Sequence, residues 1–284
     1  MTLSIVIIHY NVPTQLTACL QSLEIACDQI PHEIIVTDNA STQGPINELM
    51  TRFPKVRFIQ NTTNTGFAAA NNQTVPHCQG QYLLLLNPDT IVLPDTINRC
   101  LTFMKQHPET GALGVQMTDE HNQFRPESKR GFPGIRHSLC RFAGLHHLFP
   151  RSAWLAGYYA PHLSESDTGV VDVLTGAFLM MPASVYRQVN GFDTDFFLYG
   201  EDIDLCCRIR QAGYPLYYLG DTRIIHLKGQ SSTQKTSDYI RHFYGAMDIF
   251  VRKYYSNRPI ARTILHSGIA LARTWARIKS ALPL

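Results

Sequence analysis

Apolar runs and helix-like stretches alternate along the first 117 residues. The apolar runs are rich in β-branched residues or leucine, which is typical of strands buried on both faces of a sheet. Strands are therefore predicted at 3–9, 33–37, 56–60, 82–87 and 111–117. Helices are predicted at 13–26, 44–52, 67–75 and 94–106. Strands that alternate with helices predict an α/β fold with a mostly parallel central sheet flanked by helices.

The pattern changes after residue 117. Residues 118–168 contain four prolines, scattered basic residues and no steady period, so a variable loop region is predicted there. Regular patterning resumes at 170–181 and at 196–213. Two further strands are predicted, at 216–219 and 223–227.

The run at 82–93, YLLLLNPDTIVL, indicates where a ligand would bind. Pro88 cannot donate to a sheet ladder, so the core strand should end at about Asn87. Asp89 then lies past the carboxyl end of that strand, where open parallel sheets bind ligands. A divalent cation neutralises a pyrophosphate leaving group, and Asp89 could supply one carboxylate ligand. His226, which ends a later strand, could add a nitrogen ligand and favour Mn²⁺ over Mg²⁺. A core histidine is the alternative.

Other polar residues also follow strand-like runs. Asp38, Asn64 and Gly66 would gather at the same sheet edge, where a carboxylate can bind ribose or base hydroxyls. Gly66 lacks a Cβ and would let backbone approach phosphates. The alternative is a pair of ordinary turns, because Asp, Asn and Gly also suit turn conformations.

Three carboxylates stand within four positions just before a predicted helix: Glu201, Asp202 and Asp204. Like charges this close raise one another's pKa, which suits a general base. The alternative is acidic capping of the helix N-terminus, with Asp204 paired to Arg208 one turn later.

Composition excludes several classes of protein. The chain of 284 residues is 44% hydrophobic and 17% charged with a net charge of +3, so a sizeable core is expected and nucleic-acid binding is not. Seven cysteines without a C-x-x-C pair indicate reduced thiols and no zinc site. No signal peptide is recognised, and no apolar run reaches the roughly 18 residues of a membrane span. A cytoplasmic protein is expected.

An ordered set of short motifs resembles one known family. The motifs are SIVIIHYN, TDNAS, NTGFAAANN, LLLNPD, LTGAF, GFD, FFLYGEDIDLCCRIRQAGY and HLKGQS, between residues 3 and 231. Together they resemble the family 2 inverting glycosyltransferases of the GT-A fold, most closely their bacterial rhamnosyltransferase-like branch. The resemblance implies a Rossmann-like nucleotide half at about 1–117 and an acceptor half at about 118–235, with a C-terminal helical extension at 236–284.

The resemblance also implies roles for individual residues. Asp202 would be the catalytic base, with Glu201 beside it, and Arg208 would be structural. Asp89 would be the main acidic ligand of Mn²⁺ or Mg²⁺, because Asn87 replaces the first aspartate of the family's D-x-D motif, and His226 would be the second ligand. The donor or acceptor sugar would lie against Gly176, Ala177, Tyr199 and Glu201. The nucleotide would be held by His9, Tyr10, Asn11, Asp38, Asn64, Gly66, Phe67, Asn71 and Asn87.

The implied reaction is sugar transfer from a nucleotide-sugar, with dTDP-L-rhamnose as the expected donor and a UDP-sugar as the alternative. The acceptor would be a hydroxyl of a bacterial surface glycan or a lipid-linked saccharide. Two other functions stay open: a nucleotidyltransferase, which usually has a Gly-rich basic loop after its first strand, and a non-catalytic nucleotide-sugar-binding relative.

The last stretch, residues 258–282, has helical periodicity. Its basic residues fall on one side of a helical wheel, and its apolar residues, Trp275 among them, fall on the other. Such a helix suits peripheral contact with an anionic membrane at the inner face of the cell membrane. Docking on the catalytic domain or on a second subunit, as in a homodimer, is the alternative.

Overall fold

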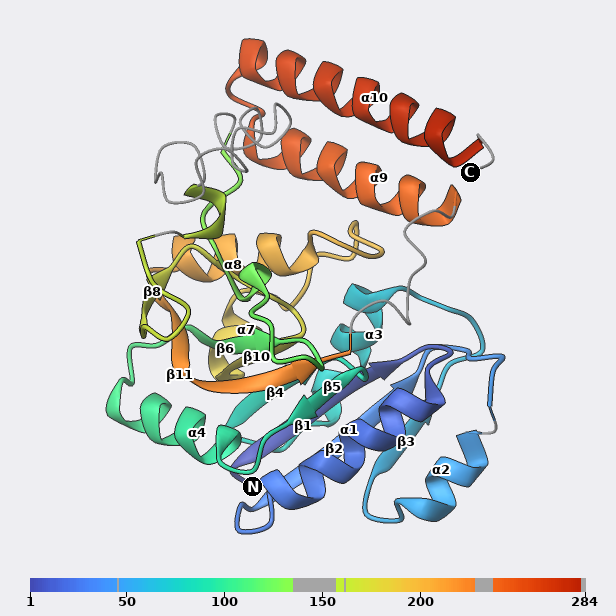
Figure 1. Ribbon diagram of the computed structural model, residues 1–284, viewed down its shortest axis with the longest axis vertical. Helices are drawn as coiled ribbons and strands as arrows, with labels where there is room; N and C mark the ends of the chain where they lie inside the picture. The colour runs from blue at the N-terminus through green and yellow to red at the C-terminus, as the bar shows by residue number, and fades with distance from the viewer. Residues whose placement is uncertain (45, 135–156, 161, 228–236, 282–284) are drawn as a thin grey trace.

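The computed structural model describes residues 1–44, 46–134, 157–160, 162–227 and 237–281. One central sheet has the strand order β3-β2-β1-β4-β10-β6-β11-β5, with β8 pairing on β11. Helices cover both faces of this sheet, and α9 and α10 form an additional layer beyond α8 (Figure 1). The predicted α/β architecture with a C-terminal helical tail is therefore confirmed.

The first half of the sheet is parallel, as predicted. Leucines 83 and 85 of β4 face one core and leucines 84 and 86 face the other, which explains the unbroken apolar run. The parallel strands are β1 (Leu3–His9), β2 (His32–Asp38), β3 (Arg57–Gln60) and β4 (Tyr82–Leu86). The connecting helices are α1 (Pro13–Ala26), α2 (Ile46–Arg52) and α3 (Phe67–Thr74), followed by η1 (Val75–His77).

The second half of the sheet is mixed. β10 (Phe178–Pro182) runs antiparallel to both β4 and β6 (Ala112–Thr118). The reason is where the chain enters: Asn87 N donates to Ala177 O at 3.0 Å, so β10 starts at the carboxyl end of β4 without a crossover helix. This antiparallel strand brings the segment before it to the candidate ligand edge.

The two strands predicted at 216–219 and 223–227 form one strand, β11 (Leu216–His226), with an irregularity between Leu219 and Arg223. A Cβ at Gly220 would lie 2.4 Å from the backbone carbon of Ser166, so a glycine permits this close approach. β11 pairs parallel with β6 and antiparallel with β5 (Thr90–Val92) and β8 (Gly169–Val171). The helices of this half are α4 (Thr96–Gln106), α7 (Ala183–Gln188) and α8 (Glu201–Gln211).

Part of the predicted loop region at 118–168 is ordered against the sheet. It contains η2 (Pro126–Ser128), η3 (Gly157–Tyr159) and the short strand β7 (Lys129–Arg130), which pairs with β9 (Val173–Leu174). Residues 135–156 lie outside the described residues, as do 228–231 of the HLKGQS motif.

Helix α9 (Ser237–Tyr254) packs on α8, and α10 (Pro259–Ala281) packs on α9. The fully buried carboxylate of Asp204 accepts from Tyr254 Oη and Lys253 Nζ, both at 2.7 Å. A buried carboxylate is stable only when it is paired in this way. The boundary between a domain at 1–235 and an extension at 236–284 remains a prediction, and α9 shares a core with α8 across it.

Candidate active site

The carboxyl ends of β1, β2 and β4 lie at one edge of the sheet, and β11 ends beside them. His9 and Asp38 end β1 and β2 and are paired in the register. Asp89 follows β4, and His226 ends β11 opposite Thr90. The strands therefore bring four of the predicted site residues, distant in sequence, to the edge that the sequence indicated.

The predicted metal ligands meet. His226 Nε2 lies 3.1 Å from Asp89 Oδ1, and the backbone N–H of Leu227 donates to Asp89 O at 2.9 Å. The two side chains are 13% and 7% exposed, so both face into the protein rather than into bulk water. The antiparallel pairing of β11 with β5 produces this contact across 137 residues of sequence.

The geometry of this pair suits a divalent cation. Two ligands at right angles around an octahedral ion, each about 2.1 Å from it, lie about 3.0 Å apart. Asp89 Oδ1 and His226 Nε2 are within hydrogen-bond distance of each other at 3.1 Å, and that separation is also compatible with two neighbouring ligands of such an ion. The described residues contain no group of three or more His, Cys, Asp or Glu side chains that could hold a metal. The remaining ligands of such an ion would have to be water or phosphate oxygens.

A side chain that the prediction missed organises the expected nucleotide edge. Asn39, 2% exposed, donates from Nδ2 to Asn64 Oδ1 at 2.9 Å and to Gly66 O at 3.2 Å. Its Oδ1 accepts from Thr65 N and Asn61 Nδ2. Asn39 directly follows Asp38, which was predicted to bind the ligand. No sequence signal showed that the side chain of Asn39 would instead hold the neighbouring loop in place.

Gly66 is required by its surroundings. Its φ is +85°, and a Cβ there would lie 2.6 Å from Phe197 O. The next residue, Phe67, donates its N–H to the same Phe197 oxygen at 2.9 Å. The start of α3 is thus joined to the segment that precedes α8, so the expected nucleotide and sugar subsites share one wall.

The other predicted nucleotide residues differ in their surroundings. Tyr10 is 43% exposed and open to a ligand, whereas Asn71 is 1% exposed and donates to Phe67 O within α3. Asn11 Oδ1 accepts from Thr42 N at 2.7 Å and Gln43 N at 3.0 Å, which braces two loops. Burial lowers the pKa of His9, although nearby Asp38 raises it. His9 is therefore held mainly neutral.

The acids at the start of α8 form the second half of the site. Asp202 Oδ2 accepts from Arg130 Nη2 at 2.5 Å and from Gly176 N at 3.2 Å. Arg130 Nη2 also donates to Leu174 O at 2.9 Å. Since Ala177 contacts Asn87, the two-residue segment Gly176–Ala177 links the end of β4 to Asp202. The predicted base, sugar floor and metal edge are therefore continuous.

Arg130 was not predicted. It lies in the region expected to be an irregular loop, and no periodicity marks it. Burial lowers the pKa of Arg130, but its interactions with Asp202 and Tyr158 together raise that pKa above the ordinary value for arginine, so the buried guanidinium stays charged. The contact with Arg130 holds the side chain of Asp202 in one orientation.

Glu201 has the opposite environment. Burial raises its pKa to about 8, with a further contribution from the charge of Asp202. Its Oε2 has no hydrogen-bond partner among the described residues. The raised pKa keeps Glu201 mainly protonated at neutral pH, which sets it apart from an ordinary glutamate.

This difference predicts a pH-dependent effect of Glu201→Gln on stability. Between the ordinary pKa near 4.5 and the folded value near 8, the folded state holds a proton that the unfolded state has lost. The wild-type protein therefore loses stability as pH rises through this window, and the glutamine variant does not share that loss. We expect urea unfolding to show a gain of the variant over wild type, on the order of 2 kcal/mol, from pH 6 to pH 9.

Glu48→Gln, on the exposed side of α2, is the matched control and should show no such pH-dependent difference. A Glu201→Gln variant whose stability follows wild type at every pH would show that Glu201 is ionised in the folded protein.

Asp204 and Arg208 form the structural pair that the sequence offered as an alternative. Arg208 Nε donates to Asp204 Oδ2 at 2.7 Å, and the guanidinium also donates to Val189 O. With Lys253 and Tyr254 on its other oxygen, Asp204 is fully occupied. The interpretation of Asp204 as a residue paired with Arg208 is confirmed. Glu201 and Asp202 remain as the candidate acids of this group.

Aromatic rings line the side of the site next to α9. Tyr199 has a φ of +70° and lies 5.5 Å from Tyr239 and 5.9 Å from Phe243, between ring centroids. Phe197 is 37% exposed and stacks on His242 at 4.5 Å. Apart from Tyr199, these rings were not predicted, because they become neighbours only when α9 folds back over α8.

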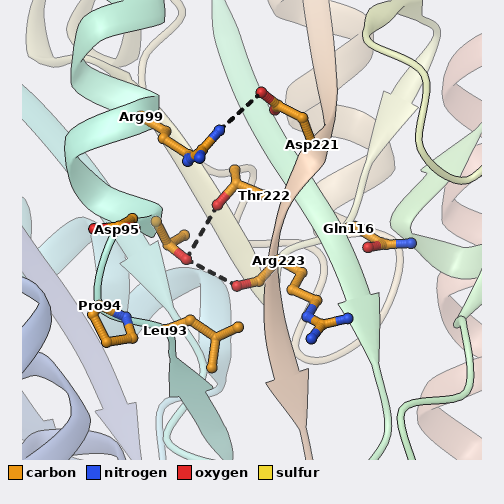
Figure 2. Close-up of a pocket in the computed structure, with 9 residues that line it drawn as sticks. Leu93, Pro94, Asp95, Arg99, Gln116, Asp221, Thr222 and Arg223 are labelled. Atoms are coloured by element: carbon orange, nitrogen blue, oxygen red, sulfur yellow. Dashed lines mark hydrogen bonds and ion pairs between the residues drawn. The ribbon is translucent and has the colours of Figure 1, made fainter.

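A surface pocket beside β5 and α4 is separate from this site. Figure 2 shows its lining, in which Thr96 Oγ1 donates to Arg223 O at 2.9 Å and Arg99 pairs with Asp221 at 3.3 Å. None of the predicted site residues lines it. Its polar contacts join α4 to β11 and so support the strand that carries His226.

Comparison with known proteins places this chain among sugar-transferring enzymes. A family model described as glycosyl transferase family 2 matches residues 4–188, and one described as the N-terminal domain of galactosyltransferase matches 171–230. The chain is 27% identical over 99% of its length to an N-acetylglucosaminyl-diphospho-decaprenol L-rhamnosyltransferase of Mycobacterium tuberculosis, 94% of which is covered. It is 27% identical over 78% of its length to the rhamnosyltransferase WbbL of Escherichia coli, 82% of which is covered.

Solved structures agree on the fold. The mannosyltransferase PcManGT of Pyrobaculum calidifontis, in complex with GDP-Man and Mn²⁺, superposes with a TM-score of 0.60 at 18% identity, over 98% of this chain and 72% of its own. TarS 1–349 of S. aureus, in complex with UDP-GlcNAc, gives 0.61 at 16% identity, over 97% and 73%. The GT-A type fold is confirmed. Because the first family model spans well over half of the 284 residues, the chain belongs to glycosyl transferase family 2.

Proposed function

We propose that this glycosyltransferase is divalent-metal-dependent and inverting, and that it moves a sugar from a nucleotide-sugar to a hydroxyl of a lipid-linked saccharide. One observation carries the proposal. The Asp89–His226 pair and the Arg130-held Asp202 are joined by Gly176–Ala177 at a single sheet edge. This arrangement sets a site for a diphosphate beside a fixed carboxylate.

Asp89 and His226 would hold Mn²⁺ or Mg²⁺ together with oxygens of the donor diphosphate. When bound, such a cation neutralises the charge that develops on the departing nucleoside diphosphate. The exposed ring of Tyr10 and the carboxylate of Asp38 lie at the same edge and would hold the base and ribose.

Asp202 would accept the proton of the acceptor hydroxyl as the acceptor oxygen bonds to the anomeric carbon. The bond from that carbon to the diphosphate breaks on the opposite face, which inverts the configuration. Arg130 orients the side chain of Asp202, and the Gly176 N–H donates to the same oxygen. Tyr199 and Phe197, from the segment before α8, would pack against the acceptor saccharide.

The relatives suggest the substrates. Two curated relatives are named rhamnosyltransferases, and one name specifies an N-acetylglucosaminyl-diphospho-decaprenol acceptor. We therefore propose dTDP-L-rhamnose as donor and a polyprenyl-diphosphate-linked saccharide of bacterial envelope polysaccharide synthesis as acceptor. A UDP-sugar is the second candidate donor, since S. aureus TarS, of similar fold, is in complex with UDP-GlcNAc.

A thermal-shift screen of nucleotide-sugars with and without Mn²⁺ tests the proposal. A donor at about 100 times its Kd should stabilise the protein by about 2.7 kcal/mol in Mn²⁺, and far less in EDTA. Asp89→Ala should remove the metal-dependent part, because it removes the carboxylate ligand. Asp95→Ala, an exposed acid six positions later (95 − 89), is the control and should respond as wild type.

The products separate the competing functions. A glycosyltransferase releases nucleoside diphosphate, a nucleotidyltransferase releases pyrophosphate, and a non-catalytic relative binds the donor without turnover. Equal donor binding in Mn²⁺ and EDTA, by wild type and Asp89→Ala alike, would contradict the metal site.

A further inference from the structure

Helix α10 is the outermost helix of the protein, with α9 between it and the catalytic sheet (Figure 1). One side of α10 packs on α9 through Leu265, which is 9% exposed, and through Ala261 and Ile269. Asp248 of α9 adds ion pairs, at 2.9 Å to His266 Nδ1 and 3.6 Å to Arg273 Nη1. These contacts fix which side of α10 faces outward.

The outward side carries a row of large apolar residues, here called the apolar stripe. A helix turns by about 100° per residue, which places the five members of this row within a sector of about 60°. Exposed large apolar residues also occur elsewhere, such as Ile25 and Val170, but the five of α10 share one side of a single helix. The members and their exposed fractions are Ile260 78%, Ile264 48%, Leu271 68%, Trp275 69% and Ile278 49%.

The charge of α10 has one sign only. The segment 259–281 has no Asp or Glu, and Arg262, Arg277 and Lys279 are exposed. By helical angle Lys279 lies about 40° beyond one edge of the apolar stripe and Arg277 about 100° beyond the other, and both have long side chains that can extend toward a surface that the stripe would enter. The helical wheel drawn from the sequence grouped the basic residues of 258–282 on one side, and two of them, His266 and Arg273, contact Asp248 of α9 in the structure.

We propose that the apolar stripe docks α10, parallel to the bilayer plane, on a membrane surface that contains anionic lipid. Apolar side chains with a tryptophan would enter the boundary between head groups and acyl chains, while the flanking cations bind lipid phosphates. A second copy of the chain fits this face less well, because two α10 helices would bring like charges together with no acid to pair them. No helix among the described residues is long and apolar enough to cross a membrane. The proposal does not depend on the identity of the donor or acceptor.

Vesicle co-sedimentation of the full chain tests the docking. The stripe variant is Leu271→Gln with Trp275→Gln, and its control is Ile25→Gln with Val170→Gln, which changes two exposed apolar residues elsewhere. On phosphatidylcholine–phosphatidylglycerol vesicles the stripe variant should lose at least about tenfold in partition coefficient, and the control should match wild type. Arg277→Gln with Lys279→Gln should weaken binding to the anionic vesicles alone, as added salt should.

Two further measurements test whether α10 itself contacts the vesicles and whether the variants remain folded. In a Trp154→Phe background, the emission of Trp275 should shift to shorter wavelength when anionic vesicles are added. Melting temperatures of the stripe variant and its control should equal that of wild type, because the changed side chains are exposed. Undiminished sedimentation of the folded stripe variant would overturn the proposal. A second result would also overturn it: light scattering shows that the wild-type protein is a dimer and the stripe variant a monomer, while both bind vesicles equally.

Discussion

Replacing Asp202 by Asn is expected to lower the rate constant for sugar transfer by about 10²–10⁴-fold, the usual contribution of a general base. Asparagine keeps the shape of the side chain, and its oxygen can still accept from Gly176 N and Arg130, so the side chain should stay in place although the contact of Asp202 Oδ1 with Ile203 N is lost. It cannot accept the acceptor proton. The Kd of the nucleotide-sugar, measured by titration calorimetry in Mn²⁺, should remain that of wild type.

Asp195→Asn is the matched control, since Asp195 is an exposed acid in the segment before α8 and should leave the rate unchanged. The neighbouring Glu201 offers a second check. Without the charge of Asp202, Glu201 should ionise more easily, because that charge contributes to its raised pKa. Any residual activity that rises with pH should vanish when Glu201→Gln is added. Wild-type turnover by Asp202→Asn would contradict its assignment as base, and loss of donor binding would instead assign it to the donor subsite.

The parts of this site that follow from strand ends were predictable. The apolar run of β4 and the proline after it located Asp89, and the end of a later strand located His226. Parallel strands align their carboxyl ends, so residues far apart in sequence converge without any local signal between them. The same reasoning placed Asp38 at this edge. The direction of β10 was not predictable in this way, because it depends on where a loop returns to the sheet.

The residues that hold the acids in place were not predictable. Arg130 lies in a segment with no period, and its partner Asp202 is 72 residues away. Basic residues are scattered throughout 118–168, and nothing local distinguishes the buried one. The role of Asn39 could not be predicted either. An asparagine after a strand can simply form a turn or can brace neighbouring loops through its amide, and the sequence is the same in both cases. Which loop residues meet depends on how the strands beneath them pack together. The hydrophobic pattern predicts each strand separately and does not show how the strands pack.

Replacing Arg130 by Met should have a large effect on both stability and catalysis. Methionine fills much of the same volume but leaves Glu201 and Asp202 buried side by side without a cation. Removing one partner of a buried ion pair typically costs about 3–5 kcal/mol of the free energy of unfolding. Arg210→Met is the control, since Arg210 Nη1 lies 2.7 Å from Asp172 Oδ1 in an ion pair whose two side chains are each about 40% exposed. That variant should lose at most about 1 kcal/mol.

The pH dependence of catalysis shows whether Arg130 positions Asp202 for the reaction or only stabilises the fold. Two acids without a neighbouring cation hold a proton more tightly, so the acid limb of the kcat/KM profile of Arg130→Met should move to higher pH. Arg130→Lys restores the positive charge and should return the acid limb of the profile toward its wild-type pH, even though lysine lacks the planar guanidinium that contacts Leu174 O and Asp202. The double variant Arg130→Met with Asp202→Asn should be less destabilised than the sum of its parts, because the uncompensated charge is gone. An unchanged pH profile in a folded Arg130→Met protein would mean that Arg130 supports the fold and leaves the chemistry to Asp202 alone.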